Sequence, residues 1–358
     1  MNRSDLLNLR RLATERLGTA TARRSFPFRM LLAILSMMPL TPGTMSAAPP
    51  PPRGEPAPVW QTSGSVSFAS ADGAEVWLIE TSGGLAAPKA SLVRIGPAGA
   101  SRVVTWPGYA YGPAADKEYV YLVVGKDIVR VDKRPPHVTK VLQKGEVWPF
   151  GVGVEGDYVY FTNQSTEGLD GGPRQGKPGS VARVRKSGDG FERLSGMSAR
   201  NLVLDPDAGK GNVYFSSNTS VCAIDKRGGA VRTLVADAGQ MADLAIDGEW
   251  LLYTRTNGVS RCNTKSGKIE PLADGIDIPL FVAAGDGATY AGANFAFQGA
   301  GKPPKPAEIL RLRPGQAPER LWSGMNRLTT MVWAAGKLYF TVEGVDGNAG
   351  TRVMRIDR

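Results

Sequence analysis

The side chains that most often carry catalysis or bind metals are scarce in this chain of 358 residues. It has a single histidine, His137, and two cysteines, Cys222 and Cys262. These numbers exclude a metal centre with several histidine ligands and a framework of disulfides. A CxxC pair, a phosphate-binding loop and a nucleophile elbow are also missing. The inventory predicts no catalytic residue and favours a binding protein over an enzyme, without settling that choice.

Carboxylates are the remaining groups that could hold a divalent cation. A Ca²⁺ site needs several carboxylate and amide oxygens that converge on one point. Asp205 and Asp247 fall in D-P and D-G pairs, which are typical of turns, so we expect them to be structural. The predicted cofactor is none. The alternative is a lactonase- or lyase-type enzyme that holds Ca²⁺ or another divalent cation in a central channel.

Aromatic side chains in two short segments give the clearest binding chemistry. "TWPGYAYG" covers residues 105–112 and "EVWPFG" covers residues 146–151. Such rings suit an apolar, glycan or peptide ligand, although they could instead fill the centre of the fold as packing. Adding the residues at equivalent places in later segments, the predicted ligand-binding set is Trp106, Tyr109, Tyr111, Trp148, Phe150, Met241 and Arg327.

A repeat explains why equivalent places exist. Short runs with a central aromatic residue occur seven times, around Trp77, Tyr121, Tyr160, Tyr214, Tyr253, Tyr290 and Tyr339. An apolar run follows each of them, with arginine at its third position in every copy but one: Arg94, Arg130, Arg183, Ala223, Arg261, Arg311 and Arg355. The mean spacing is about 44 residues, which lies in the range of propeller blades.

Each repeat has four short apolar runs without helical periodicity, which predicts a four-stranded antiparallel meander. One such sheet has two apolar faces and must pack between two others, so we expect a closed ring of sheets. The predicted fold is all-β: a seven-bladed β-propeller over residues 58–358. Six or eight blades are the alternatives, because the sixth copy, "GATYAGA", is degenerate.

The ends of the repeat array predict how the ring closes. The seventh copy stops after its third run, whereas "PVWQTSG" (58–64) precedes the first copy like an isolated fourth strand. We predict that Val59–Thr62 pairs with Val353–Ile356. Aligned by repeat, Cys222 and Cys262 project from equivalent sheet faces, so we expect two buried, unpaired thiols. The recurrent arginines should lay their stems over a neighbouring sheet and keep their heads polar.

The repeat resembles the exported bacterial β-propellers whose blades contain an aromatic run such as "DYVYFTN" and an arginine run such as "SVARVRKSGDG". A similar blade pattern is found in virginiamycin B lyase, gluconolactonase-like lactonases and Tol-type propellers. The resemblance implies the fold over residues 57–358. It does not imply the lyase activity, which depends on a catalytic histidine, because His137 lies in the turn "KRPPHVTK" on the opposite rim.

The first 48 residues have the order of a secretory signal. A region with seven arginines precedes "MLLAILSMMPL" (30–40) and a stretch of small residues. A disordered basic tail is the alternative. "RRSF" (23–26) matches the start of a twin-arginine signal. We therefore predict a signal peptide over 1–48, a proline-rich linker over 49–57 and a periplasmic or secreted protein.

Charge and loop lengths complete the functional prediction. The formal net charge of +10 falls to about +5 without the leader and is spread along the chain, so no nucleic-acid partner is expected. No transmembrane segment is expected in the mature chain, which we predict to be a monomer. The longest links, 163–180 and 293–308, fall on one rim. We predict an exported, non-catalytic propeller that binds a protein, small-molecule or glycan ligand on that rim; a cofactor-carrying export substrate is a third hypothesis.

Overall fold

The structure is a computed structural model that describes residues 55–84, 86–146, 148–164, 178–207, 210–239, 243–294, 305–344 and 350–357. The predicted signal peptide, most of the linker, Met241 and most of the two longest links lie outside these residues. All regular secondary structure within the described residues is β-strand. None of them forms a helix long and apolar enough to cross a membrane.

Within the described ranges, twenty-eight strands form seven four-stranded antiparallel sheets. The first strands of the blades are β2 (Ser65–Asp72), β6 (Ala110–Ala115), β10 (Pro149–Glu155), β14 (Leu202–Leu204), β18 (Leu244–Asp247), β22 (Pro279–Gly285) and β26 (Arg327–Ala334). The second strands are β3 (Glu75–Ser82), β7 (Tyr119–Val124), β11 (Tyr158–Asn163), β15 (Asn212–Ser217), β19 (Trp250–Arg255), β23 (Ala288–Ala293) and β27 (Lys337–Glu343). The third strands are β4 (Lys89–Gly96), β8 (Asp127–Asp132), β12 (Ser180–Arg185), β16 (Ser220–Asp225), β20 (Gly258–Asn263), β24 (Ala307–Leu312) and β28 (Thr351–Asp357). The fourth strands are β5 (Gly99–Pro107), β9 (Thr139–Gln143), β13 (Glu192–Ser195), β17 (Arg232–Val235), β21 (Ile269–Asp274), β25 (Glu319–Gly324) and β1 (Ala57–Thr62).

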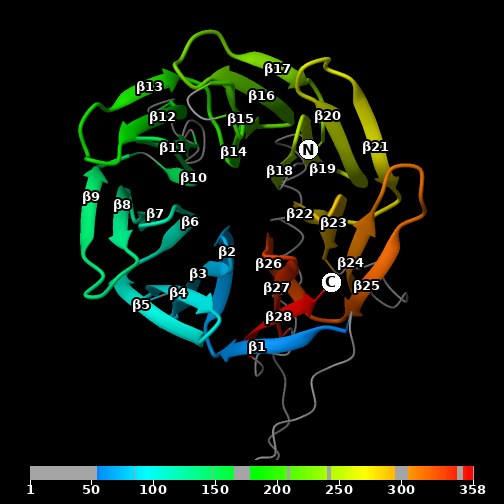
Figure 1. Cartoon of the computed structure of the whole chain (residues 1–358), viewed down its shortest axis with the longest axis horizontal. Coiled ribbons are helices and arrows are strands. Elements are labelled where there is room, and N and C mark those ends of the chain that lie inside the picture. Colours follow the sequence, from blue (N-terminus) through cyan, green and yellow to red (C-terminus); the bar gives the residue numbers. More distant parts are fainter. Residues whose placement is uncertain are drawn as a thin grey trace, which may run out of the picture. The chain divides into compact units, whose positions relative to one another are not determined.

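The seven sheets stand in a ring as the blades of a β-propeller (Figure 1). The first strand of each blade faces the central axis and contacts the first strand of the next, from β2 through β26 and back to β2. The seven-blade prediction is thus confirmed, and the alternatives of six or eight blades are wrong. Within a blade, the loop between the second and third strands and the link to the next blade lie at the same end of the sheet. We call this end the link rim and the opposite end the turn rim.

The ring closes as predicted, because β1 supplies the fourth strand of blade 7. Trp60 pairs with Val353 and Thr62 pairs with Thr351 across the antiparallel β1–β28 ladder. The Thr62 hydroxyl also donates to the buried carboxylate of Glu80 in blade 1, and the same carboxylate accepts a 2.7 Å hydrogen bond from Arg102. Burial raises the pKa of Glu80, but the bonds from Arg102 and Thr62 outweigh it and hold the pKa below its usual value. The carboxylate is therefore charged and ties the last blade to the first.

Seven apolar clusters form the core, one at each interface between neighbouring blades. Each blade therefore buries both of its faces, as the sequence pattern requires. The recurrent aromatic residues of the second strands are at most 8% exposed, so they belong to this core. Cys222 packs between blades 3 and 4 and Cys262 between blades 4 and 5. Both thiols are buried and unpaired, which confirms the prediction.

Two of the recurrent arginines, Arg130 and Arg183, join neighbouring blades on the turn rim. Arg130 stacks over Tyr119, 4.2 Å from the ring centroid, and donates to the carbonyl of Lys186 in the next blade at 2.9 Å. Arg183 repeats this arrangement over Tyr158 and donates to the carbonyl of Lys226 at 2.7 Å. The guanidinium heads of these two arginines are thus hydrogen-bonded across the blade interface, whereas Arg94, Arg261, Arg311 and Arg355 form ion pairs with carboxylates of their own blades.

A second set of interblade contacts, not foreseen from the sequence, comes from lysines three residues after the arginine position. Lys133 reaches back to Asp72, and Lys186 reaches back to Asp116, each at 2.6 Å. Lys226 reaches Glu155 at 2.7 Å and is the most buried of the three, with 1% of its side chain exposed. These ion pairs join each of blades 2, 3 and 4 to the blade before it.

Candidate functional site

The link rim carries a ring of exposed apolar side chains. Most large apolar residues of the described chain are in the seven clusters, but five that are 38–49% exposed lie on five different interblade links. In blade order they are Tyr109, Trp148, Met197, Ile278 and Met325. We call these five residues the link-rim ring. The other four exposed large apolar residues of the described chain, Val138, Val141, Phe191 and Ile269, lie away from the interblade links.

Three of the predicted site residues come together, and one of them, Tyr109, is also a member of this ring. Tyr109 and Tyr111 stack with their ring centroids 6.5 Å apart, and Tyr111 stacks on Phe150 of the next blade at 6.0 Å. Tyr109 lies in the link before β6, and Tyr111 and Phe150 are the second residues of β6 and β10, the strands that face the central axis (Figure 1). Stacked and edge-to-face rings at these distances attract each other beyond their apolar contact.

Phe68 completes the group, and the sequence analysis missed it. Its ring meets Tyr111 and Phe150 edge to face, at centroid distances of 5.6 and 5.2 Å. It is the extra residue of a β-bulge in β2, with φ at 57°, a backbone region that bulky side chains rarely adopt. Such backbone strain persists where the surroundings enforce it and is found most often at functional sites. We call Phe68, Tyr109, Tyr111 and Phe150 the axial aromatic cluster.

Two glycines allow the strands that carry the cluster to approach closely. A Cβ atom on Gly112 would lie 2.3 Å from the carbonyl oxygen of Phe150, and one on Gly151 would lie 2.7 Å from that of Arg200. Gly112 also has φ at 51°. Any larger residue at these two positions would push neighbouring first strands apart. The glycines next to Tyr111 and Phe150 are therefore part of what brings the rings together across blades 2 and 3.

Arg200 adds a positive charge to the cluster. It lies in the link before β14 and is exposed, with its guanidinium carbon 4.8 Å from the centroid of the Phe150 ring. Its carbonyl is held by the Thr162 hydroxyl, which fixes the link against blade 3. An arginine that stacks on an aromatic ring while its charged edge faces water can bind a carboxylate.

The other predicted site residues take different places. Trp148 is 40% exposed in the link before β10 and belongs to the link-rim ring. Trp106 was expected in a link, but β5 extends through it; it pairs with Ala90 and packs on the core between blades 1 and 2. Arg327 begins β26 in blade 7, and its guanidinium lies 3.8 Å from the carboxylate of Glu343.

The cluster offers recognition chemistry. Burial, with a smaller contribution from Tyr109, raises the pKa of the Tyr111 hydroxyl, which stays protonated and can donate a hydrogen bond. Within the described residues, no three His, Cys, Asp or Glu side chains lie close enough together to hold a metal ion. His137 lies in the turn between β8 and β9, and its Nδ1 is 3.0 Å from the carbonyl oxygen of Asp132. Asp205 accepts a 3.1 Å bond from the Tyr214 hydroxyl beside a turn, as a structural residue would.

Comparison with known proteins shows the fold and no closer relationship. No protein-family model and no curated protein matches the sequence. The extracellular domain of a hybrid two-component system from B. thetaiotaomicron matches 84% of this chain at 10% identity and a TM-score of 0.56. YCF48 bound to D1 peptide matches 85% at 10% identity and a TM-score of 0.56. A puromycin-hydrolyzing peptidase of Mycobacterium tuberculosis matches 86% at 14% identity and a TM-score of 0.56.

The coverage of these proteins differs. This chain spans 39% of the two-component system domain and 55% of the peptidase, but 96% of YCF48. At such low sequence identities the likeness extends to architecture alone, since one propeller fold serves many unrelated functions. The likeness supports a β-propeller and does not single out any of the propeller families that the repeat resembles. The chain is, in architecture, a β-propeller.

Proposed function

We propose that this chain is an exported, non-catalytic β-propeller that binds a peptide segment of a partner protein on its link rim. The observation that carries the proposal is the link-rim ring, with the axial aromatic cluster beside it. Five of the nine exposed large apolar residues of the described chain lie on this rim, and rigid aromatic residues supply much of the energy of protein–protein contacts. Export rests on the signal-like order of residues 1–48.

Two of the structural neighbours are consistent with this role. The structure of YCF48 contains a bound D1 peptide, and this chain matches 96% of the length of YCF48. Another neighbour is an extracellular domain. A rigid disc with loops on one rim needs no moving part to present a binding surface, because the blades fix the loops.

The residues on the rim define the chemistry of the expected peptide. Tyr109, Tyr111 and Phe150 offer ring faces and edges on which aromatic or proline side chains can stack. Arg200 lies beside them with an exposed guanidinium and favours an acidic side chain or a free carboxyl terminus. We therefore expect a segment that combines aromatic residues with at least one carboxylate.

Selection of a random peptide library on the purified protein tests the proposal. We expect enriched peptides to contain aromatic and acidic residues. Tyr109→Ala should weaken their binding by about 30-fold, the effect of a residue worth about 2 kcal/mol. Arg200→Gln should weaken acidic peptides and leave peptides lacking a carboxylate unchanged. Fluorescence anisotropy of labelled peptides measures both effects.

A matched control is available on the opposite rim. Phe191 is 42% exposed, close to the 38% of Tyr109, but it lies in the turn between β12 and β13. Phe191→Ala should leave peptide affinity unchanged. Because both aromatic residues are exposed, neither substitution should unfold the protein. The proposal would be wrong if enriched peptides bound Tyr109→Ala as tightly as the native protein, or if they lost affinity for Phe191→Ala instead.

A further inference from the structure

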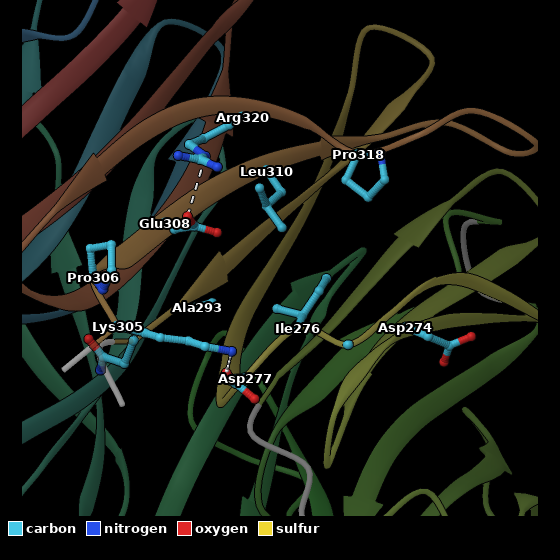
Figure 2. A pocket seen from close by; sticks show the side chains of 12 residues that line it. Asp274, Ile276, Asp277, Ala293, Lys305, Pro306, Glu308, Leu310, Pro318 and Arg320 are labelled. Carbon is cyan, nitrogen blue, oxygen red and sulfur yellow. Dashed lines mark hydrogen bonds and ion pairs between the residues drawn. The ribbon is translucent and has the colours of Figure 1, made fainter. Parts of the chain in front are cut away.

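A cavity of about 390 Å³ lies between blades 5 and 6, apart from the axial aromatic cluster. Its walls come from the link between β21 and β22 (Asp274 to Asp277), the end of β23 (Ala293), β24 with the residues before it, and β25 (Figure 2). This volume is at the lower end of the ~300–1,000 Å³ found for small-molecule sites. The cavity can therefore hold a molecule of the size of an amino acid or a dipeptide.

At the cavity the sixth repeat has a smaller residue than the corresponding place of blades 1 and 3. Ala293 is three residues after the core aromatic Tyr290, and the same place holds Glu80 in blade 1 and Asn163 in blade 3. Both of those side chains are buried and hydrogen-bonded, and they fill the corresponding space. The methyl group of Ala293 leaves the space open. The degenerate sequence of the sixth copy thus has a structural consequence.

The walls of the cavity combine two ion pairs with an apolar surface. Lys305 lies 2.5 Å from Asp277, and Arg320 lies 3.3 Å from Glu308. Figure 2 shows these pairs on one side of the cavity, with Ile276, Leu310 and Pro318 beyond them. Ile276 and Leu310 are 6% and 7% exposed, so each offers a small apolar surface to the cavity. The cavity thus presents both signs of charge near one end and apolar side chains further along, with Asp274, which pairs with Arg255, beyond Ile276 (Figure 2).

We propose that this cavity binds a free α-amino acid with an aliphatic side chain. Its ammonium group would lie at the carboxylates of Asp277 or Glu308 and its carboxylate at Lys305 or Arg320, while the side chain contacts Ile276 and Leu310. The side chains of Lys305 and Arg320 are 53% and 64% exposed. Ion pairs this exposed contribute little to stability, so the protein loses little when they open to exchange partners with a zwitterion. A ligand with one charge would leave one of the opened groups without its partner.

Isothermal titration calorimetry with L-leucine on the full chain tests this inference. We expect saturable binding of L-leucine. N-acetyl-leucine lacks the ammonium group and leucinamide lacks the carboxylate, and each should bind at least about tenfold more weakly. Glycine, which has no side chain for the apolar wall, should also bind at least about tenfold more weakly. No heat with millimolar L-leucine, or equal binding of all four compounds, would overturn the inference.

Three variants locate the binding. Ala293→Glu introduces the residue that fills this place in blade 1 and should abolish L-leucine binding. Arg320→Gln changes an exposed residue, so it keeps the fold even if the first variant does not, and it should weaken binding about tenfold. Lys265→Gln removes a more exposed ion pair, that with Glu249, and should change nothing. Undiminished binding to Arg320→Gln would place the ligand elsewhere. The selected peptides of the link rim should bind all three folded variants equally, which separates this site from the proposed function.

Discussion

Replacing Lys226 with alanine should destabilise the propeller by about 3–5 kcal/mol, the range found when one partner of a buried ion pair is removed. The Lys226 ammonium is held by Glu155 at 2.7 Å and by the carbonyl oxygens of Asp205 and Asp207 at 2.7 and 2.8 Å. These three bonds use all three of its protons. Alanine removes the cation that faces a carboxylate of the preceding blade and takes a donor from the carbonyls of Asp205 and Asp207, of which Asp207 keeps the Lys210 amide at 3.2 Å. Urea unfolding at neutral pH measures the loss.

The matched control is Lys265, which belongs to the neighbouring blade. It lies 2.5 Å from Glu249, but 75% of its side chain is exposed. Exposed pairs contribute about 0–1 kcal/mol, so Lys265→Ala should leave the free energy of unfolding nearly unchanged. Equal losses for the two variants would show that burial between blades 3 and 4 does not give Lys226 its importance.

The Asp243 carboxyl should make the protein less stable as the pH rises from 5 to 8. It precedes β18 and accepts hydrogen bonds from the backbone amides of Val282 in the next blade and of Leu244. Burial raises the pKa of Asp243 to about 7, and the two amide bonds offset only part of this effect. In the unfolded chain the pKa is near its ordinary value of 3.8. Between these values the folded protein holds a proton that the unfolded chain has lost.

The direction of the effect follows from this difference in bound protons. Stability falls with rising pH wherever the folded state binds more protons, so the loss develops between about pH 4 and pH 7 and is complete above pH 7. A pKa difference of this size corresponds to at most about 4 kcal/mol. Carboxyls whose pKa is lowered, such as Glu80, Asp116 and Asp225, contribute stability that disappears only at more acidic pH. Their titration therefore does not mask the loss of stability that Asp243 causes between about pH 4 and pH 7.

Asp243→Asn should remove this pH dependence, because the amide is uncharged throughout. The variant should melt at a higher temperature than the native protein at pH 8, with a smaller difference at pH 5. Thermal unfolding at pH values across this range measures both. Asp237, exposed in the same link, provides the control, and Asp237→Asn should follow the native curve. A native protein that becomes more stable from pH 5 to 8 would contradict the assignment.

The fold could be predicted from the sequence because every repeat has the same pattern of apolar runs and must bury both faces of its sheet against its neighbours. The central aromatic residues of the second strands lie in the core of each blade. The seventh copy has three strands of its own, and the segment around Val59 supplies the fourth. The arginine spacing also carries over directly, since Arg130 and Arg183 make the same contacts in successive blades. A pattern that recurs in seven copies identifies each strand more surely than the sequence of any single strand does.

The site was only partly predictable, because its contacts run between blades. Tyr109 and Trp148 were found by their equivalent places in the repeat, but Phe68 reaches the cluster through a bulge that no alternation pattern reveals. Lys226 looks in sequence like a surface lysine, and only the neighbouring blade makes it buried. The cavity lies beside Ala293, where a small residue leaves space, and a sequence search for catalytic or metal-binding side chains does not detect such a place. Trp106 was misplaced because the end of β5 could not be fixed to the residue.

Site-specific photocrosslinking tests the central claim, that the link rim is the binding face, most directly. p-Benzoylphenylalanine would replace Tyr109 in one protein and Phe191 in the other, two aromatic positions of similar exposure on opposite rims. Irradiation in the presence of a selected peptide, or of the living cell's own proteins, should give a covalent adduct from position 109 and none from position 191. Adducts from position 191 alone, or equally from both, would contradict it.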